Sequence, residues 1–104
     1  MVTTMSLFRS IRGWAHERNL IDGSNPQAQF VKLIEEAGEL AAGIARKQHP
    51  AIEDGIGDMI VVLTILAEQH GLDIEQCIEV AWHSIKDRTG RMVDGVFIKD
   101  SENK

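Results

Sequence analysis

The sequence predicts an all-α fold of four helices with a short β-hairpin near the C-terminal end. Three observations support this prediction. Apolar residues recur at the spacing of an amphipathic helix along four stretches of the chain. Glycine, proline, serine and asparagine interrupt the pattern between these stretches. Near the end, an Asp-Gly pair stands between two short apolar runs, which is the signal of a tight hairpin turn.

The first two helices are predicted over residues 6–19 and 27–47. The apolar side of the first is formed by Leu7, Ile11 and Trp14. The loop between the two helices is rich in breakers, and Ser24 or Asn25 is placed to cap the second helix, with Pro26 in its first turn. The apolar stripe of the second helix is formed by Phe30, Leu33, Ile34, Ala37, Ala41 and Ile44.

The third helix is predicted from Pro50 to His70, and the fourth from its cap at Asp73 to Thr89. The third helix is apolar nearly all round, so we expect it to be the most buried element. The hairpin is predicted over residues 91–98 around Asp94 and Gly95. Because a two-stranded hairpin is marginally stable alone, it must pack against helices.

The length predicts a single domain over residues 1–104, with a flexible polar tail at 99–104. The net charge of -5 disfavours broad binding to a phosphate backbone, so we expect no nucleic-acid partner. The start of the chain lacks the regions of a signal peptide, and the longest apolar run, 59–66, is too short for a bilayer. The single cysteine, Cys77, excludes an internal disulfide. We therefore expect a cytoplasmic protein without a membrane partner.

Acidic residues gather at helical spacing on two of the predicted helices. Glu35, Glu36 and Glu39 lie on the second helix, and Asp54 and Asp58 lie one turn apart on the third, where they extend an apolar stripe. Like charges at these spacings are unfavourable unless a cation lies between them. Because Mg²⁺ prefers oxygen ligands, the pattern favours a metal site. The alternative is that these acids form an ordinary solvated surface.

Glycines inside the predicted helices are a second unusual feature. They are Gly38, Gly43, Gly55 and Gly57. Each costs about 1 kcal/mol relative to alanine in a helix interior. Either the two helices approach each other closely at these positions, or the helices are irregular there.

Residues 32–41 (KLIEEAGELA) and 53–62 (EDGIGDMIVV) together resemble the MazG-like nucleotide pyrophosphohydrolases. These belong to the all-α NTP pyrophosphatase superfamily, with the helical dUTPases and the phosphoribosyl-ATP pyrophosphatases. The resemblance covers roughly residues 14–99. In the family pattern, Glu-x-x-Glu is followed by Glu-x-x-Asp. Glu36 and Glu39 match the first pair and Asp58 matches the last acid, whereas Gly55 stands at the third position, where we expect Asp54 to substitute.

The resemblance implies an antiparallel four-helix bundle-like domain that assembles as a homodimer or homotetramer. It also implies a Mg²⁺-dependent hydrolase, with Mn²⁺ as an alternative ion, that converts an NTP or dNTP to the monophosphate and pyrophosphate. Such an enzyme would clean the nucleotide pool. The substrate alternatives within the fold are dUTP, dCTP and a phosphoribosyl nucleotide. The non-catalytic alternative is a helical interaction module with a solvated acidic face.

The implied roles fall to particular residues. The metal ligands would be Glu36, Glu39, Asp54 and Asp58. The acceptor of the water proton would be Glu35 or Glu36. Phosphate groups would be bound by Lys86, Arg88 and Lys32, although Lys86 and Arg88 also suit the C-terminal end of a helix dipole. The base would contact Trp14, Asn19 or Gln27, with core packing as the alternative for Trp14.

Overall fold

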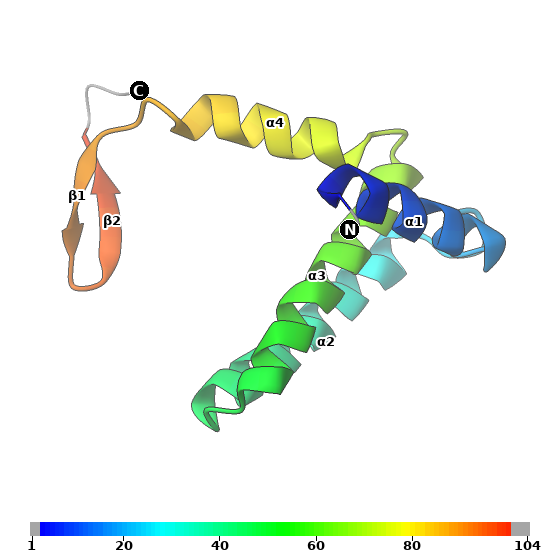
Figure 1. The fold of residues 1–104 in the computed structure, drawn as a ribbon, viewed down its shortest axis with the longest axis horizontal. Coiled ribbons are helices and arrows are strands. Elements are labelled where there is room, and N and C mark those ends of the chain that lie inside the picture. The colour runs from blue at the N-terminus through cyan, green and yellow to red at the C-terminus, as the bar shows by residue number, and fades with distance from the viewer. Residues whose placement is uncertain (1–2, 101–104) are drawn as a thin grey trace.

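The computed structural model describes residues 3–100, apart from the side chain of Met5, and contains four helices and one hairpin within that range (Figure 1). The helices are α1 (Thr4–Glu17), α2 (Pro26–Ala45), α3 (His49–Gln69) and α4 (Ile74–Ile85). The strands β1 (Gly90–Val93) and β2 (Val96–Lys99) pair antiparallel. The prediction of a mostly helical chain with a C-terminal hairpin is confirmed.

The helix ends follow the local chemistry of the sequence. Asn25 caps α2, because its side-chain oxygen accepts a hydrogen bond from the Ala28 amide at 2.8 Å. Each of the first three helices is followed by a residue in the left-handed region, which allows the last carbonyls to be satisfied. These residues are Asn19 at φ 58°, Lys47 at φ 56° and Gly71 at φ 70°.

The hairpin turns at Asp94 and Gly95, as predicted. Both residues have positive φ, 50° and 81°, as a type I′ turn requires. At the base of the hairpin, the Asp100 amide donates to the Thr89 carbonyl at 2.9 Å, and the Thr89 hydroxyl donates to the Asp100 carboxylate at 2.7 Å. Lys99 and Asp100 therefore belong to the hairpin rather than to the predicted tail, and residues 101–104 lie outside the described part of the chain.

Helices α2 and α3 form an antiparallel pair, and glycines allow them to approach closely. A Cβ at Gly55 would lie 3.1 Å from the Leu40 Cβ, and a Cβ at Gly43 would lie 3.2 Å from a side chain at the start of α3. Close approach is therefore confirmed at these two positions. At Gly38 and Gly57 a Cβ would meet no packed neighbour within 4 Å, so packing does not explain them.

The core lies where α1 and the loop after it cross α3. Ala15, Ile21 and Ile65 are its most buried members, and Leu20 and Val61 pack against them. Helix α3 contributes half of the buried residues of the described chain, more than any other element, as its apolar character predicts. None of the helices within residues 3–100 has the length and hydropathy needed to cross a membrane.

Helix α4 leaves this core soon after it begins. Ile74 is buried, whereas every residue from Ile78 to Asp100 is exposed. Residues 78–100 are called the C-terminal arm below. In Figure 1 the arm runs away from α1 and α3 and carries the hairpin at its far end. The four helices therefore do not close into the predicted bundle within one chain, and α4 ends at Ile85 instead of Thr89 because no described residue packs against its last turn.

The dimensions agree with this open arrangement. The Cα radius of gyration is 16.3 Å. A compact domain of this length is expected to have a radius of gyration of about 13 Å. A single chain thus leaves the arm without a surface to pack on.

Two polar contacts hold α1 against its neighbours, and the first of them is an ion pair. The Arg12 guanidinium donates two hydrogen bonds to the Glu75 carboxylate, at 2.6 and 2.8 Å, and so joins α1 to the first turn of α4. These bonds hold the pKa of Glu75 below its usual value and raise the pKa of Arg12. His16 Nε2 lies 2.6 Å from Glu68 Oε2 and joins α1 to α3. The Arg12–Glu75 contact thus ties α1 to the helix from which the arm continues.

Candidate active site

A cleft of about 640 Å³ lies between α1, α2 and α3. Five of the predicted site residues line it: Trp14, Lys32, Glu35, Glu36 and Asp58. The other residues of its wall are mostly apolar, namely Leu20, Ala28, Gln29, Val31, Val61, Val62 and Ile65. A smaller hollow between α1 and α3 shares Trp14, Asp58 and Val61 with it, so the two openings meet at Asp58.

Glu36 is the one acidic side chain of the described chain that is buried, with 6% of its surface exposed. Lys32, one helical turn earlier, lies with its Nζ 3.2 Å from Glu36 Oε2. The other carboxylate oxygen, Oε1, is buried and has no hydrogen-bond partner among the described residues. A buried carboxylate oxygen without a donor is unfavourable, so this atom is suited to a cationic ligand.

Asp58 lies beside Glu36 on the facing helix. The pKa of Asp58 is raised, first by desolvation and then by the negative charges of Asp54 and Glu36, both of which are within interacting distance. Carboxylates from α2 and α3 therefore converge, as the spacing of the acids predicts. The antiparallel contact at Gly55 brings the two helices close enough for this convergence.

Lys32 and Glu35 complete the polar side of the cleft, and Glu39 lies near it on α2. The pKa of Lys32 is raised by its hydrogen bond to Glu36, by the charge of Glu36, and more weakly by Glu35 and Glu39. Glu35 lines the cleft directly, and Glu39 is an exposed residue one turn further along α2. The positive charge of Lys32 therefore interacts with several negative charges at the polar side of the cleft.

Trp14 stands at the α1 side of the cleft and is 42% exposed, so it is not a core residue. The Arg18 guanidinium carbon lies 5.0 Å from the centre of the Trp14 ring, over one of its faces. A flat, partly exposed ring beside an acidic centre is a suitable surface for stacking.

The donor set fits Mg²⁺, although it is not a closed cage. Within residues 3–100, no three Asp, Glu, His or Cys side chains already form a complete metal-binding group. Mg²⁺ usually keeps several waters and takes one or two carboxylates together with substrate phosphates, so an open set is what it requires. The unpartnered oxygen of Glu36 and the mutual repulsion at Asp58 are both features that a divalent cation would relieve.

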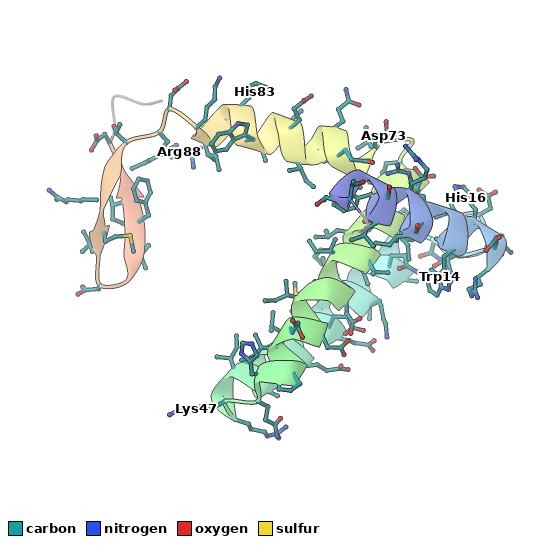
Figure 2. The ribbon with its side chains drawn as sticks, viewed as in Figure 1. Trp14, His16, Lys47, Asp73, His83 and Arg88 are labelled. Carbon is teal, nitrogen blue, oxygen red and sulfur yellow. The ribbon has the colours of Figure 1, made fainter. Side chains whose placement is uncertain are left out.

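Four predicted residues lie elsewhere. Gln27 lies beside a shallow hollow with Phe30 on another side of α2. Asn19 adopts the left-handed conformation after α1, and its carbonyl accepts a hydrogen bond from the Gly23 amide at 3.1 Å. Lys86 and Arg88 lie on the C-terminal arm, and Figure 2 shows Arg88 between α4 and the hairpin, far along the arm from Trp14. One chain therefore does not bring these two cations to the cleft.

The sequence interpretation missed Gln29 and the apolar wall. Gln29 lines the cleft, and its Nε2 donates to Ser24 Oγ at 3.0 Å. A signal for it was present, because Gln29, Lys32 and Glu36 follow one another at helical spacing on the acidic side of α2. The apolar wall had no local signal, since it comes from α2, α3 and the loop after α1.

Comparisons with known proteins identify the family of the chain. A protein of Haemophilus phage HP1 (strain HP1c1), described as an uncharacterized 18.2 kDa protein in the rep-hol intergenic region, is 47% identical over 73 residues. Those residues are 70% of this chain but only 45% of the phage protein. No solved structure matches the chain. The MazG nucleotide pyrophosphohydrolase domain matches residues 24–92, which include every acid of the cleft. The resemblance in the sequence is confirmed, and this chain belongs to the MazG nucleotide pyrophosphohydrolase domain family.

Proposed function

We propose that this chain is a Mg²⁺-dependent nucleoside triphosphate pyrophosphohydrolase that converts an NTP or dNTP and water to the monophosphate and pyrophosphate. One observation carries the proposal. The buried, unpartnered oxygen of Glu36 lies next to Asp58, whose pKa is raised by neighbouring carboxylates, in a cleft large enough for a nucleotide. A polyanionic substrate can enter such a cleft only together with cations.

The acids divide into two roles. Glu36, Glu39, Asp54 and Asp58 would hold the ion, with Asp54 in place of an acid at the third position of the family pattern. When bound, Mg²⁺, or Mn²⁺ in its place, neutralises phosphate charge and makes a neighbouring water more acidic. Glu35 lines the cleft and forms no ion pair within the described part of the chain, so it is the better acceptor of the water proton, with Glu36 as the alternative.

The remaining cleft residues would orient the substrate. Lys32 would exchange part of its contact with Glu36 for a phosphate oxygen. The exposed face of Trp14 would stack on the base, and the apolar wall would exclude water around it. Asn19 and Gln27, which were predicted to contact the base, lie outside the cleft and are weaker proposals.

Phosphate binding by Lys86 and Arg88 requires a second copy of the chain, because the arm leads away from the cleft of its own chain. We therefore propose a homodimer or homotetramer in which the cations of one arm reach a neighbouring cleft. The alternative of a non-catalytic module with a solvated acidic face is less favoured, because Glu36 is buried rather than solvated.

A screen of common and modified nucleoside triphosphates for pyrophosphate release, with and without Mg²⁺, tests the proposal. We expect Mg²⁺-dependent release from at least one substrate, and loss of that release in Glu36→Gln and Glu39→Gln with an unchanged helical CD spectrum. Glu53→Gln is the matched control, because Glu53 is an exposed acid of α3 that does not line the cleft. Absence of release from every triphosphate, together with no Mg²⁺-linked binding of a non-hydrolysable triphosphate, would favour the interaction module.

A further inference from the structure

The hairpin at the end of the C-terminal arm has two apolar faces. Because side chains alternate along a strand, the register places Met92 opposite Phe97 on one face, and Val93 opposite Val96 on the other. Ile98 lies on the second face, opposite Arg91. The five apolar side chains are between 41% and 63% exposed. A hairpin that is apolar on both sides and covered on neither has no internal source of stability.

The apolar surface continues from the hairpin along α4. Ile78, Trp82 and Ile85 recur at helical spacing, and all three are about half exposed. The same side of the helix begins at Ile74, which is buried in the body of the chain. The arm is therefore one amphipathic surface that starts in the core and runs out of it, rather than a set of isolated exposed residues.

A matching surface exists on the body. The side of the α2–α3 pair away from the acids exposes large apolar residues from both helices, called the apolar α2–α3 face below. Its members are Phe30, Ile34, Ile44, Ile56 and Ile60. On α2 these residues lie at i, i+4 and i+14, whereas Glu35 and Glu39 point to the opposite side.

The chain exposes more surface than a compact monomer of its size, and the difference is as large as the interface of an obligate dimer. The chain exposes 7825 Å². A compact monomer of 11.6 kDa is expected to expose about 5,800 Å², which leaves an excess of about 2,000 Å² per chain. A standard interface covers only about 800 Å² on each partner, and obligate homodimers cover more. The excess therefore suffices for a partner of the same size.

Charge favours a second copy over a foreign acidic or basic partner. Between Lys86 and Lys99 the chain carries four Lys and Arg side chains against two Asp. Residues 3–77 carry six Lys and Arg against eleven Asp and Glu. A basic end of the arm and an acidic body on the same chain are complementary when two copies meet reciprocally.

We propose that the hairpin is a clasp: it docks on the apolar α2–α3 face of a second copy and is folded only in that assembly. This inference rests on the self-assembly named under the proposed function, but not on Lys86 and Arg88 reaching a neighbouring cleft, and it adds the segment that forms the contact. All of β2 lies beyond residue 92, where the match to the MazG domain ends, so the clasp extends this chain beyond the matched domain.

Sedimentation velocity over a concentration series tests the clasp with one substitution on each hairpin face, Phe97→Asp and Ile98→Asp. Both side chains are exposed in the single chain, so neither substitution removes a core contact. We expect each to weaken assembly by at least about 100-fold, because a charge would enter an apolar interface twice in a symmetric dimer. Val80→Asp, on the side of α4 away from the stripe, is the matched control and should leave assembly unchanged.

Hydrogen exchange of the hairpin amides provides the second measurement. We expect the peptide containing residues 90–99 to become protected over the same concentration range in which the sedimenting mass rises. Assembly that persists in both hairpin variants, or assembled wild-type protein whose hairpin amides still exchange freely, would overturn the clasp. Neither result concerns pyrophosphate release, whereas a chain that assembles through the hairpin but hydrolyses no triphosphate would overturn the proposed function alone.

Discussion

The body of the chain and its C-terminal arm use similar residues in opposite ways. In the body, apolar side chains such as Ile65 are buried, and an acid, Glu36, is buried with them. In the arm, apolar side chains such as Trp82 and Phe97 are exposed although their pattern is equally amphipathic. The body therefore contains a site in which acids outnumber its cation Lys32, and the arm contains further cations and apolar surface without a site of their own. The two regions are complementary halves that one chain does not bring together.

The largest effect that separates the regions is expected from Asp58→Asn. Pyrophosphate release should fall about 1,000-fold, since a lost metal contact removes several kcal/mol of charge stabilisation. The metal-free protein should at the same time melt at a higher temperature, because the change removes a carboxylate that Asp54 and Glu36 repel. Thermal melting with and without Mg²⁺ measures the second part. An activity that survives the substitution would remove Asp58 from the site.

The next largest effect tests whether the arm of one chain acts in the cleft of another. Lys86→Ala should lower kcat/KM by about 10- to 100-fold, the range for loss of a hydrogen bond to a charged group. If Lys86 acts on a neighbouring cleft, an equal mixture of Lys86→Ala and Asp58→Asn chains, each strongly impaired alone, should recover about a quarter of wild-type activity, because half the dimers are mixed and each has one intact site. A mixture that stays inactive after subunit exchange would place Lys86 outside the partner's site.

The same contrast explains which features could be predicted from the sequence. The hairpin turn at Asp94 and the cap at Asn25 depend on neighbouring residues alone, so local patterns predicted them. The convergence of Glu36 and Asp58 also followed, since two helices with acids at helical spacing face each other. The open position of α4 could not be predicted, because its apolar stripe is the same whether its partner lies in its own chain or in another. For that reason the roles of Lys86 and Arg88 remain proposals.

A smaller effect, on the free energy of unfolding, is expected from substituting two glycines of α3 within the body. Gly57→Ala should stabilise the protein by about 0.5–1 kcal/mol, because a helical alanine is preferred and a Cβ there meets no packed neighbour. Gly55→Ala should not give this gain, since its Cβ would lie 3.1 Å from the Leu40 Cβ and the α2–α3 contact would have to open. Chemical denaturation of both variants measures the difference. Equal stabilisation would mean that the helices are not held together at Gly55.

The smallest effect is a pair of opposite pH dependences, one from the cleft and one from the start of the arm. The pKa of Asp58 is raised in the folded chain, so its contribution to stability is complete below its unfolded pKa and is lost as the pH rises through the folded pKa. The pKa of Glu75 is lowered by Arg12, so its contribution is present above its unfolded pKa and is lost as the pH falls through the folded pKa.

Melting temperatures of metal-free Asp58→Asn and Glu75→Gln, measured from about pH 3 to pH 7, separate the contributions of these two carboxylates to stability. Relative to wild type, Asp58→Asn should gain stability as the pH rises, whereas Glu75→Gln should lose it. Adding Mg²⁺ at neutral pH should stabilise wild type and Glu75→Gln but have little effect on Asp58→Asn, because only the cleft gains a ligand. If the melting temperatures of both variants, relative to wild type, changed in the same direction with pH, the cleft would not differ electrostatically from the Arg12–Glu75 contact. The complementarity of the two regions would then rest on their apolar surfaces alone.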